Sequence, residues 1–78
     1  MENSQLVHEL ICNFEGREFL IQVYLRPDGS HFARTEFSPQ DVIISDGFSL
    51  EEALNKHQHL LPLAVHSRMM PCSSRLIN

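Results

Sequence analysis

The chain has 78 residues, 42% apolar and 21% charged, a composition typical of one folded domain that excludes a disordered or membrane-embedded chain. Six basic residues against ten acidic ones give a formal net charge of -4, and the cations are scattered singly, so we expect no direct binding to nucleic acid. The amino-terminal sequence MENSQLVHEL lacks the regions of a signal peptide, and we therefore expect a cytoplasmic protein that contacts no membrane.

The length predicts a single small domain over residues 1–70, followed by a flexible tail over residues 71–78. A domain of this size buries a modest core, so dimerisation is an obvious source of further stability. Cys12 and Cys72 are too far apart in sequence for a metal knuckle or a redox pair, and we expect reduced thiols.

Three segments in the first half of the chain have the pattern of β-strands: residues 6–14, 18–25 and 31–37. Glu15–Gly16 and the segment RPDGS supply the turns between them, because Gly and Pro stand where reversing turns need their special backbone angles. The segment DVIIS then forms either a short fourth strand or an extension of the third beyond a bulge.

Alternation along each strand assigns one side to the core. That side carries Leu6, His8, Leu10, Cys12 and Phe14 in the first strand, Phe19, Ile21, Val23 and Leu25 in the second, and Ala33, Thr35 and Phe37 in the third.

The next segment, ISDGFSLEEAL, joins a strand to a helix. We expect Gly47 to end the extended run by adopting backbone angles closed to β-branched residues. Ser49 then caps the helix, and Glu52 is expected to reach back to the backbone amide of Ser49 in a capping box, with Ala53 following in the first turn.

An apolar stripe at helical spacing follows this cap, and it must lie on the sheet. It consists of Leu50, Ala53, Leu54, His57, Leu61, Ala64 and Val65. Pro62 is expected to kink the helix or to split it after Leu61. The predicted fold is therefore α+β, an antiparallel meander of three or four strands packed against one carboxy-terminal amphipathic helix.

Catalytic chemistry has little support in these residues. The sequence has no glycine-rich phosphate loop, its aspartates stand at turns, and neither cysteine has a fixed base nearby, so we expect no enzyme, no cofactor and no catalytic or metal-ligating residue. The alternative is a small metal- or ligand-binding protein that uses the helix histidines His57, His59 and His66. Their spacing is poor for chelation, because residues two apart on a helix point in nearly opposite directions.

One helix can cover only one face of such a sheet, and the other face is predicted to remain rich in large apolar groups. It would carry Val7, Ile11, Leu20, Tyr24, Phe32 and Ile43, mixed with Glu9, Gln22, Arg34 and Glu36. So many apolar groups on a small domain favour a protein contact over a solvent-facing surface. We therefore predict that Leu20, Tyr24, Phe32 and Arg34 bind a partner and that the chain forms a homodimer.

Two groups of residues form a further pattern: Asp28, Gly29, His31, Phe32 and Ala33 in and after the second turn, then Gly47, Ser49, Glu51, Glu52, Ala53 and Leu54 at the helix start. Through these residues, the segment 19–65 resembles the amino-terminal domain of HicB-like antitoxins, which has a truncated RNase H-like fold. The resemblance implies a non-catalytic, acidic interaction module that neutralises a small basic RNA-cleaving toxin.

Overall fold

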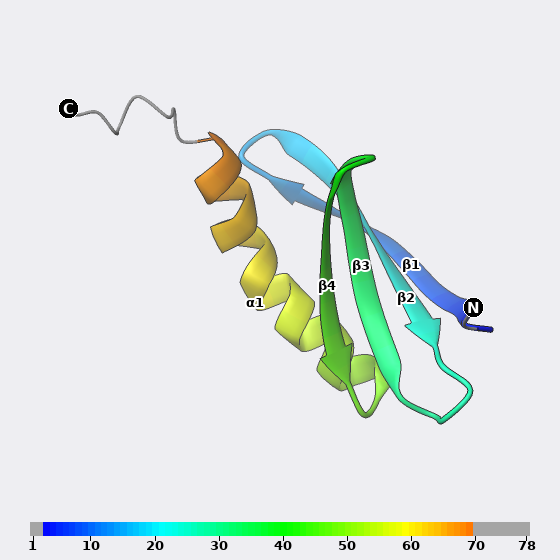
Figure 1. The fold of residues 1–78 in the computed structure, drawn as a ribbon. Coiled ribbons are helices and arrows are strands. Elements are labelled where there is room, and N and C mark those ends of the chain that lie inside the picture. Colours follow the sequence, from blue (N-terminus) through cyan, green and yellow to red (C-terminus); the bar gives the residue numbers. More distant parts are fainter. Residues whose placement is uncertain (1–2, 70–78) are drawn as a thin grey trace.

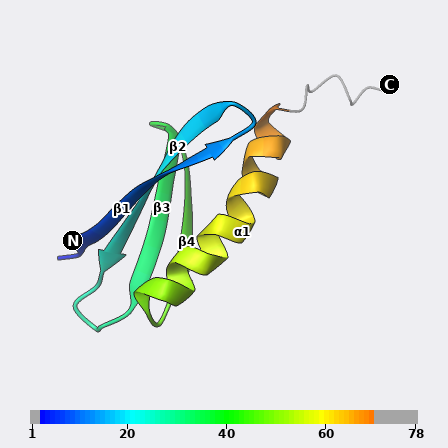
Figure 2. The same cartoon turned by 180° about the vertical axis from the view of Figure 1, so that it is seen from behind.

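The computed structural model describes residues 3–69, which form one antiparallel sheet and one helix. The sheet has the order β1 (Gln5–Phe14), β2 (Arg17–Leu25), β3 (His31–Ser38) and β4 (Asp41–Gly47), and α1 (Leu50–Met69) follows it. Figure 1 shows α1 lying along one face of the sheet, and Figure 2 shows the same layers from behind. The predicted α+β meander is confirmed, and its fourth segment is a separate strand. The predicted tail, residues 71–78, lies outside the described residues.

Both predicted turns before β3 form, and each uses a glycine with positive φ. Glu15 (φ 56°) and Gly16 (φ 75°) make the two-residue hairpin between β1 and β2, a geometry whose twist matches that of the strands. In the second turn, the backbone amide of Gly29 (φ 94°) donates to the Arg26 carbonyl at 3.0 Å. The Asp28 carboxylate accepts from the Ser30 hydroxyl and backbone amide, which lowers the pKa of Asp28.

The core lies between the sheet and α1. Its fully or nearly fully buried apolar side chains are Ile21, Val23, Ala33, Ala53, Leu61 and Val65, and Leu10, Cys12, Phe14, Phe19, Phe37, Ile43, Leu50 and Leu54 pack around them. The predicted core sides of β3 and of β2 from Phe19 to Val23, and the predicted helix stripe, are therefore confirmed. Four of the six most buried side chains in this cluster are Ala or Val, so the apolar surface that stabilises this domain is limited.

Two side chains lie on the opposite face from the one predicted. A bulge at Val7 shifts the register between β1 and β2, so Leu6 pairs with Tyr24 and faces away from the helix. Ile43 pairs with the buried Thr35 and packs on the core, whereas its neighbour Ile44 is the exposed one. The run Val42–Ile44 is apolar on both sides, so its alternation carries no signal.

The helix begins at Leu50, as predicted, with Ser49 as its cap. The Ser49 hydroxyl accepts from the Glu52 amide at 3.1 Å. The Glu52 carboxylate, however, accepts from the amide of Phe48 at 2.9 Å and not from that of Ser49, so the predicted target of Glu52 is wrong by one residue.

Gly47 is required for a different reason from the one predicted. It does not have a positive φ, and it belongs to β4. A Cβ at this position would lie 2.5 Å from the backbone nitrogen of Ala53 and 2.9 Å from its Cα. The end of β4 and the first turn of α1 therefore touch backbone to backbone, and only glycine leaves room for that contact.

Pro62 lies inside α1, which runs unbroken from Leu50 to Met69. Of the two outcomes expected at Pro62, a kink or a split after Leu61, the split is therefore wrong. Leu61, Ala64 and Val65, on both sides of the proline, are buried against the sheet, and this packing holds the helix together across the missing backbone donor.

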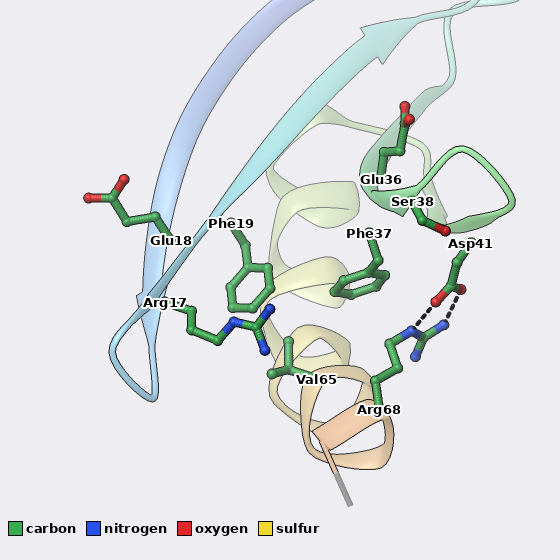
Figure 3. Close-up of a pocket in the computed structure, with 9 residues that line it drawn as sticks. All are labelled: Arg17, Glu18, Phe19, Glu36, Phe37, Ser38, Asp41, Val65 and Arg68. Atoms are coloured by element: carbon green, nitrogen blue, oxygen red, sulfur yellow. Dashed lines mark hydrogen bonds and ion pairs between the residues drawn. The ribbon is translucent and has the colours of Figure 1, made fainter.

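The sheet is not fully closed between its two central strands. The β2–β3 ladder pairs Gln22–Leu25 with His31–Arg34 and goes no further, although both strands continue. Figure 3 shows β2 and β3 diverging beyond this point, with Phe19 and Phe37 between them and α1 behind. We call this opening the fork.

Gly47→Ala tests the backbone contact between β4 and α1. The added methyl group overlaps the Ala53 backbone, and we expect a loss of about 1–3 kcal/mol in the free energy of unfolding, measured by urea denaturation. Gly16→Asn is the matched control, because that position has open space around it and asparagine tolerates a positive φ. A Gly47→Ala protein as stable as the wild type would contradict the close approach.

Candidate functional site

The sheet face turned away from α1, which we call the open face, contains all four residues predicted to bind a partner. Cross-strand neighbours lie on the same side of a sheet, so the register arranges its side chains in rows. One row contains Leu6, Tyr24, Phe32 and Asp46; the next contains Glu9, Gln22, Arg34 and Ile44; a third contains Ile11 and Leu20, with Glu36 and Val42 across the fork.

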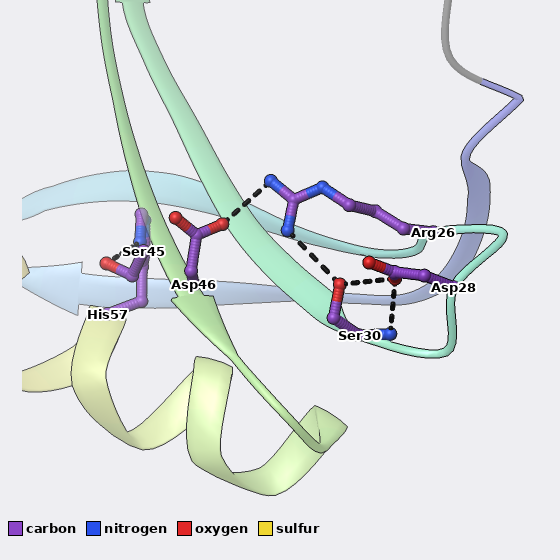
Figure 4. Close-up of polar contacts among 6 residues, drawn as sticks. All are labelled: Arg26, Asp28, Ser30, Ser45, Asp46 and His57. Carbon is purple, nitrogen blue, oxygen red and sulfur yellow. Dashed lines mark hydrogen bonds and ion pairs between the residues drawn. The ribbon is translucent and has the colours of Figure 1, made fainter.

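The first row is built around a stacked aromatic pair. The rings of Tyr24 and Phe32 lie 5.0 Å apart at 12°, and the Arg26 guanidinium lies 4.5 Å from the centre of the Phe32 ring. Figure 4 shows Arg26 reaching across to Asp46, with which it forms an ion pair of 2.7 Å. These contacts hold the aromatic pair as a flat, ordered platform.

The second row is a chain of polar contacts. Gln22 donates to Glu9 at 3.0 Å, and Arg34 donates to Gln22 at 3.3 Å and to Glu36 at 3.0 Å. Arg34 therefore lies at the centre of the open face with its charge already paired. It separates the aromatic platform from the apolar side chains of the third row.

Large apolar side chains are exposed on both sides of this polar row. Their exposed fractions are 43% for Leu6, 61% for Ile11, 44% for Leu20 and 51% for Ile44. Sequence reasoning missed Leu6 and Ile44, because the bulge that turns Leu6 outward and the phase of β4 are both set by strand pairing.

The open face is also acidic. The strands place Glu9, Glu18, Glu36 and Asp46 on it, against the two guanidinium groups of Arg26 and Arg34. With four carboxylates and two cations, this face attracts positive charge at neutral pH.

The covered face has a buried histidine at its centre. The His57 side chain is fully buried, and its ring bridges β3 and β4: Nε2 lies 2.8 Å from the Thr35 hydroxyl and Nδ1 lies 3.0 Å from the Ser45 hydroxyl. Figure 4 shows the contact with Ser45. Thr35 also donates to the Leu20 carbonyl on β2 at 3.0 Å, so this group of residues joins α1 to three strands.

The hydrogen bonds fix the tautomer of His57. The single hydroxyl proton of Thr35 goes to the Leu20 carbonyl, so the Thr35 oxygen accepts from an Nε2–H group. Burial disfavours the charged form of the ring and lowers the pKa of His57 below the ordinary 6.5. The ring is therefore neutral at pH 7, and its Nδ1 accepts from the Ser45 hydroxyl.

The three helix histidines are not brought together as metal ligands. Both ring nitrogens of His57 are occupied inside the protein, whereas His59 and His66 are exposed, and His59 Nδ1 contacts the Asn55 carbonyl at 2.8 Å. Among residues 3–69, no three histidine, cysteine or carboxylate side chains are grouped to hold a metal ion. Cys12 packs against the core with a free thiol, while Cys72 lies outside the described residues.

Comparisons with protein-family models, with curated proteins and with solved structures each find no match to this chain. Within the part of the chain that the structure describes, no helix is both long and apolar enough to cross a membrane.

The buried neutral histidine predicts an acid-sensitive fold. Below pH 6.5, His57 becomes protonated in the unfolded chain but stays neutral in the folded chain, because burial lowers its pKa there. The free energy of unfolding therefore falls as the pH falls, by up to about 1.4 kcal/mol for each pH unit. This fall ends when the pH reaches the lowered pKa of the folded state. Urea denaturation between pH 7.5 and about 5, above the carboxylate range, measures this slope.

His57→Gln removes that proton uptake, and His59→Gln is the matched control, because His59 lies on the exposed side of the same helix. We expect His57→Gln to flatten the slope and His59→Gln to retain it. Equal slopes in the wild type and in His57→Gln would contradict the assignment.

Proposed function

We propose that the chain is a non-catalytic protein-interaction module, antitoxin-like in its role, and that its open face binds a small basic protein. The observation that carries this proposal is the juxtaposition on one face of exposed apolar side chains and an excess of carboxylates.

The apolar side chains supply the driving force for association. Ile11, Leu20 and Ile44 are each exposed by 44% or more, and they lie on a sheet face that no other part of residues 3–69 covers. Removing apolar surface from water yields about 25 cal/mol for each Å², so these side chains favour a protein contact. The stacked pair of Tyr24 and Phe32 adds an ordered aromatic anchor of the kind that dominates interface energies.

The charges indicate which partner fits. Four carboxylates surround the apolar side chains, and the whole chain has a net charge of -4, so a basic surface would associate faster and more tightly than a neutral or acidic one. The resemblance of residues 19–65 to HicB-like antitoxins supports the same choice of partner, since antitoxins of that family neutralise small basic toxins.

Binding of the chain to the protein encoded by the adjoining reading frame tests this proposal. We expect that frame to encode a short basic protein that binds the chain, with a dissociation constant measurable by titration calorimetry. Leu20→Lys should weaken this binding at least tenfold, because it places a cation on the acidic face and removes an apolar contact. Leu63→Lys, on the exposed outer side of α1, is the matched control and should bind as the wild type does. The proposal would be contradicted if the basic protein from the adjoining frame did not bind the chain. It would also be contradicted if Leu63→Lys weakened that binding as much as Leu20→Lys does.

In the absence of that partner, we expect two open faces to pair in a homodimer at micromolar concentration. The double variant Tyr24→Ser with Phe32→Lys should sediment as a folded monomer, because it removes the aromatic platform without touching the core between sheet and helix. Leu63→Ser should remain dimeric. A monomeric wild type at high concentration would show that the open face is not self-complementary.

A further inference from the structure

The fork between β2 and β3 forms a cavity of about 410 Å³ that is open to solvent on one side, and its volume is within the range of small-molecule sites in proteins. It lies at the end of the sheet where α1 also ends. Figure 3 shows its lining, which β2, β3, the start of β4 and the last turns of α1 supply.

The fork is held open by specific contacts. The Thr35 hydroxyl donates a hydrogen bond of 3.0 Å to the Leu20 carbonyl, just beyond the last residue pair of the β2–β3 ladder. Past this point Phe19 and Phe37 meet edge to face, with ring centres 5.8 Å apart at 69°. The two rings lie between the strands, and together with Val65 they give the cavity an apolar floor.

Two arginines flank this floor, and only one of them has its charge paired. Arg68 binds Asp41 through two hydrogen bonds of 2.6 Å, which lowers the pKa of Asp41, so this pair is neutral overall. Arg17 has no carboxylate partner within residues 3–69. Its guanidinium lies 5.9 Å from the centre of the Phe19 ring, and Figure 3 shows it directed toward the cavity.

Two further carboxylates line the cavity but form no ion pair with Arg17. Glu18 and Glu36 belong to the open face, and Figure 3 shows their carboxylates directed away from the Arg17 guanidinium. Glu36 is already paired with Arg34 at 3.0 Å. Of the two arginines that line the cavity, Arg17 is therefore the one without a carboxylate partner within residues 3–69, and its guanidinium lies beside the Phe19 ring.

We propose that the fork cavity binds a small monocarboxylate with a flat apolar body, such as an aromatic acid. A guanidinium presents parallel N–H groups that match a carboxylate, and the edge-to-face rings of Phe19 and Phe37 offer a surface on which a planar group packs. With a single unpaired cation, the site suits a monoanion better than a phosphate dianion, whose second charge would have no partner. This ligand is independent of the protein partner assigned to the open face.

Benzoate is the probe for this site. Titrated at millimolar concentrations into the full chain, it should shift the backbone amide NMR signals of residues 17–19, 36–38, 65 and 68 in a saturable manner. Benzamide, the neutral counterpart, lacks the carboxylate that would pair with Arg17, and acetate lacks the ring that would pack on Phe19 and Phe37. Each should therefore bind at least tenfold more weakly than benzoate. Inorganic phosphate should bind no better than acetate.

Arg17→Gln is the decisive variant, because Arg17 is exposed on the strand surface and its replacement leaves the core intact. It should weaken benzoate binding at least tenfold, whereas Arg34→Gln, a matched change on the open face, should leave the dissociation constant unchanged. Benzoate shifts centred elsewhere, no saturation, equal affinity for phosphate, or an Arg17→Gln protein that binds as the wild type does would each overturn the proposal.

Discussion

The interaction on which the rest of this structure depends is the double hydrogen bond of the buried His57 ring to Thr35 and Ser45. In a core made largely of Ala, Val and single Leu and Ile side chains, apolar burial alone gives little specificity for how a helix lies on a sheet. A buried imidazole with both nitrogens satisfied is different, because a shift of the helix along the sheet would leave two hydroxyl groups or a ring nitrogen without partners, at about 1–3 kcal/mol each. The ring therefore fixes the position of α1 as well as stabilising it.

This placement determines what the domain leaves available. Because α1 packs on β4, β3 and part of β2, the whole opposite face of the sheet stays uncovered by residues 3–69. The same network also reaches Leu20 through Thr35, at the point where the β2–β3 ladder ends. The buried network around His57 thus affects both surfaces for which we propose a role. These are the open face, which suits a basic protein, and the fork cavity, which suits a small carboxylate.

Sequence patterns predicted the elements well and the details of pairing less well. Local chemistry sets the turns at Gly16 and Gly29 and the cap at Ser49, and each is recoverable from the sequence because its cause lies within a few residues. Register is not local. The bulge that turns Leu6 outward depends on β2, and the need for glycine at position 47 comes from Ala53 on the helix. The partners of His57 are likewise 12 and 22 residues away, so the stripe predicted its burial but not its hydrogen bonds.

The most direct test of this account is the protonation and tautomer of the His57 ring, observed through the nitrogen-15 NMR shifts of its two ring nitrogens. We expect a neutral ring that carries its proton on Nε2, with that proton protected from exchange, and a pKa for the folded protein that lies below the ordinary 6.5. A proton on Nδ1, or a ring that becomes charged near pH 6.5 while the protein stays folded, would contradict it.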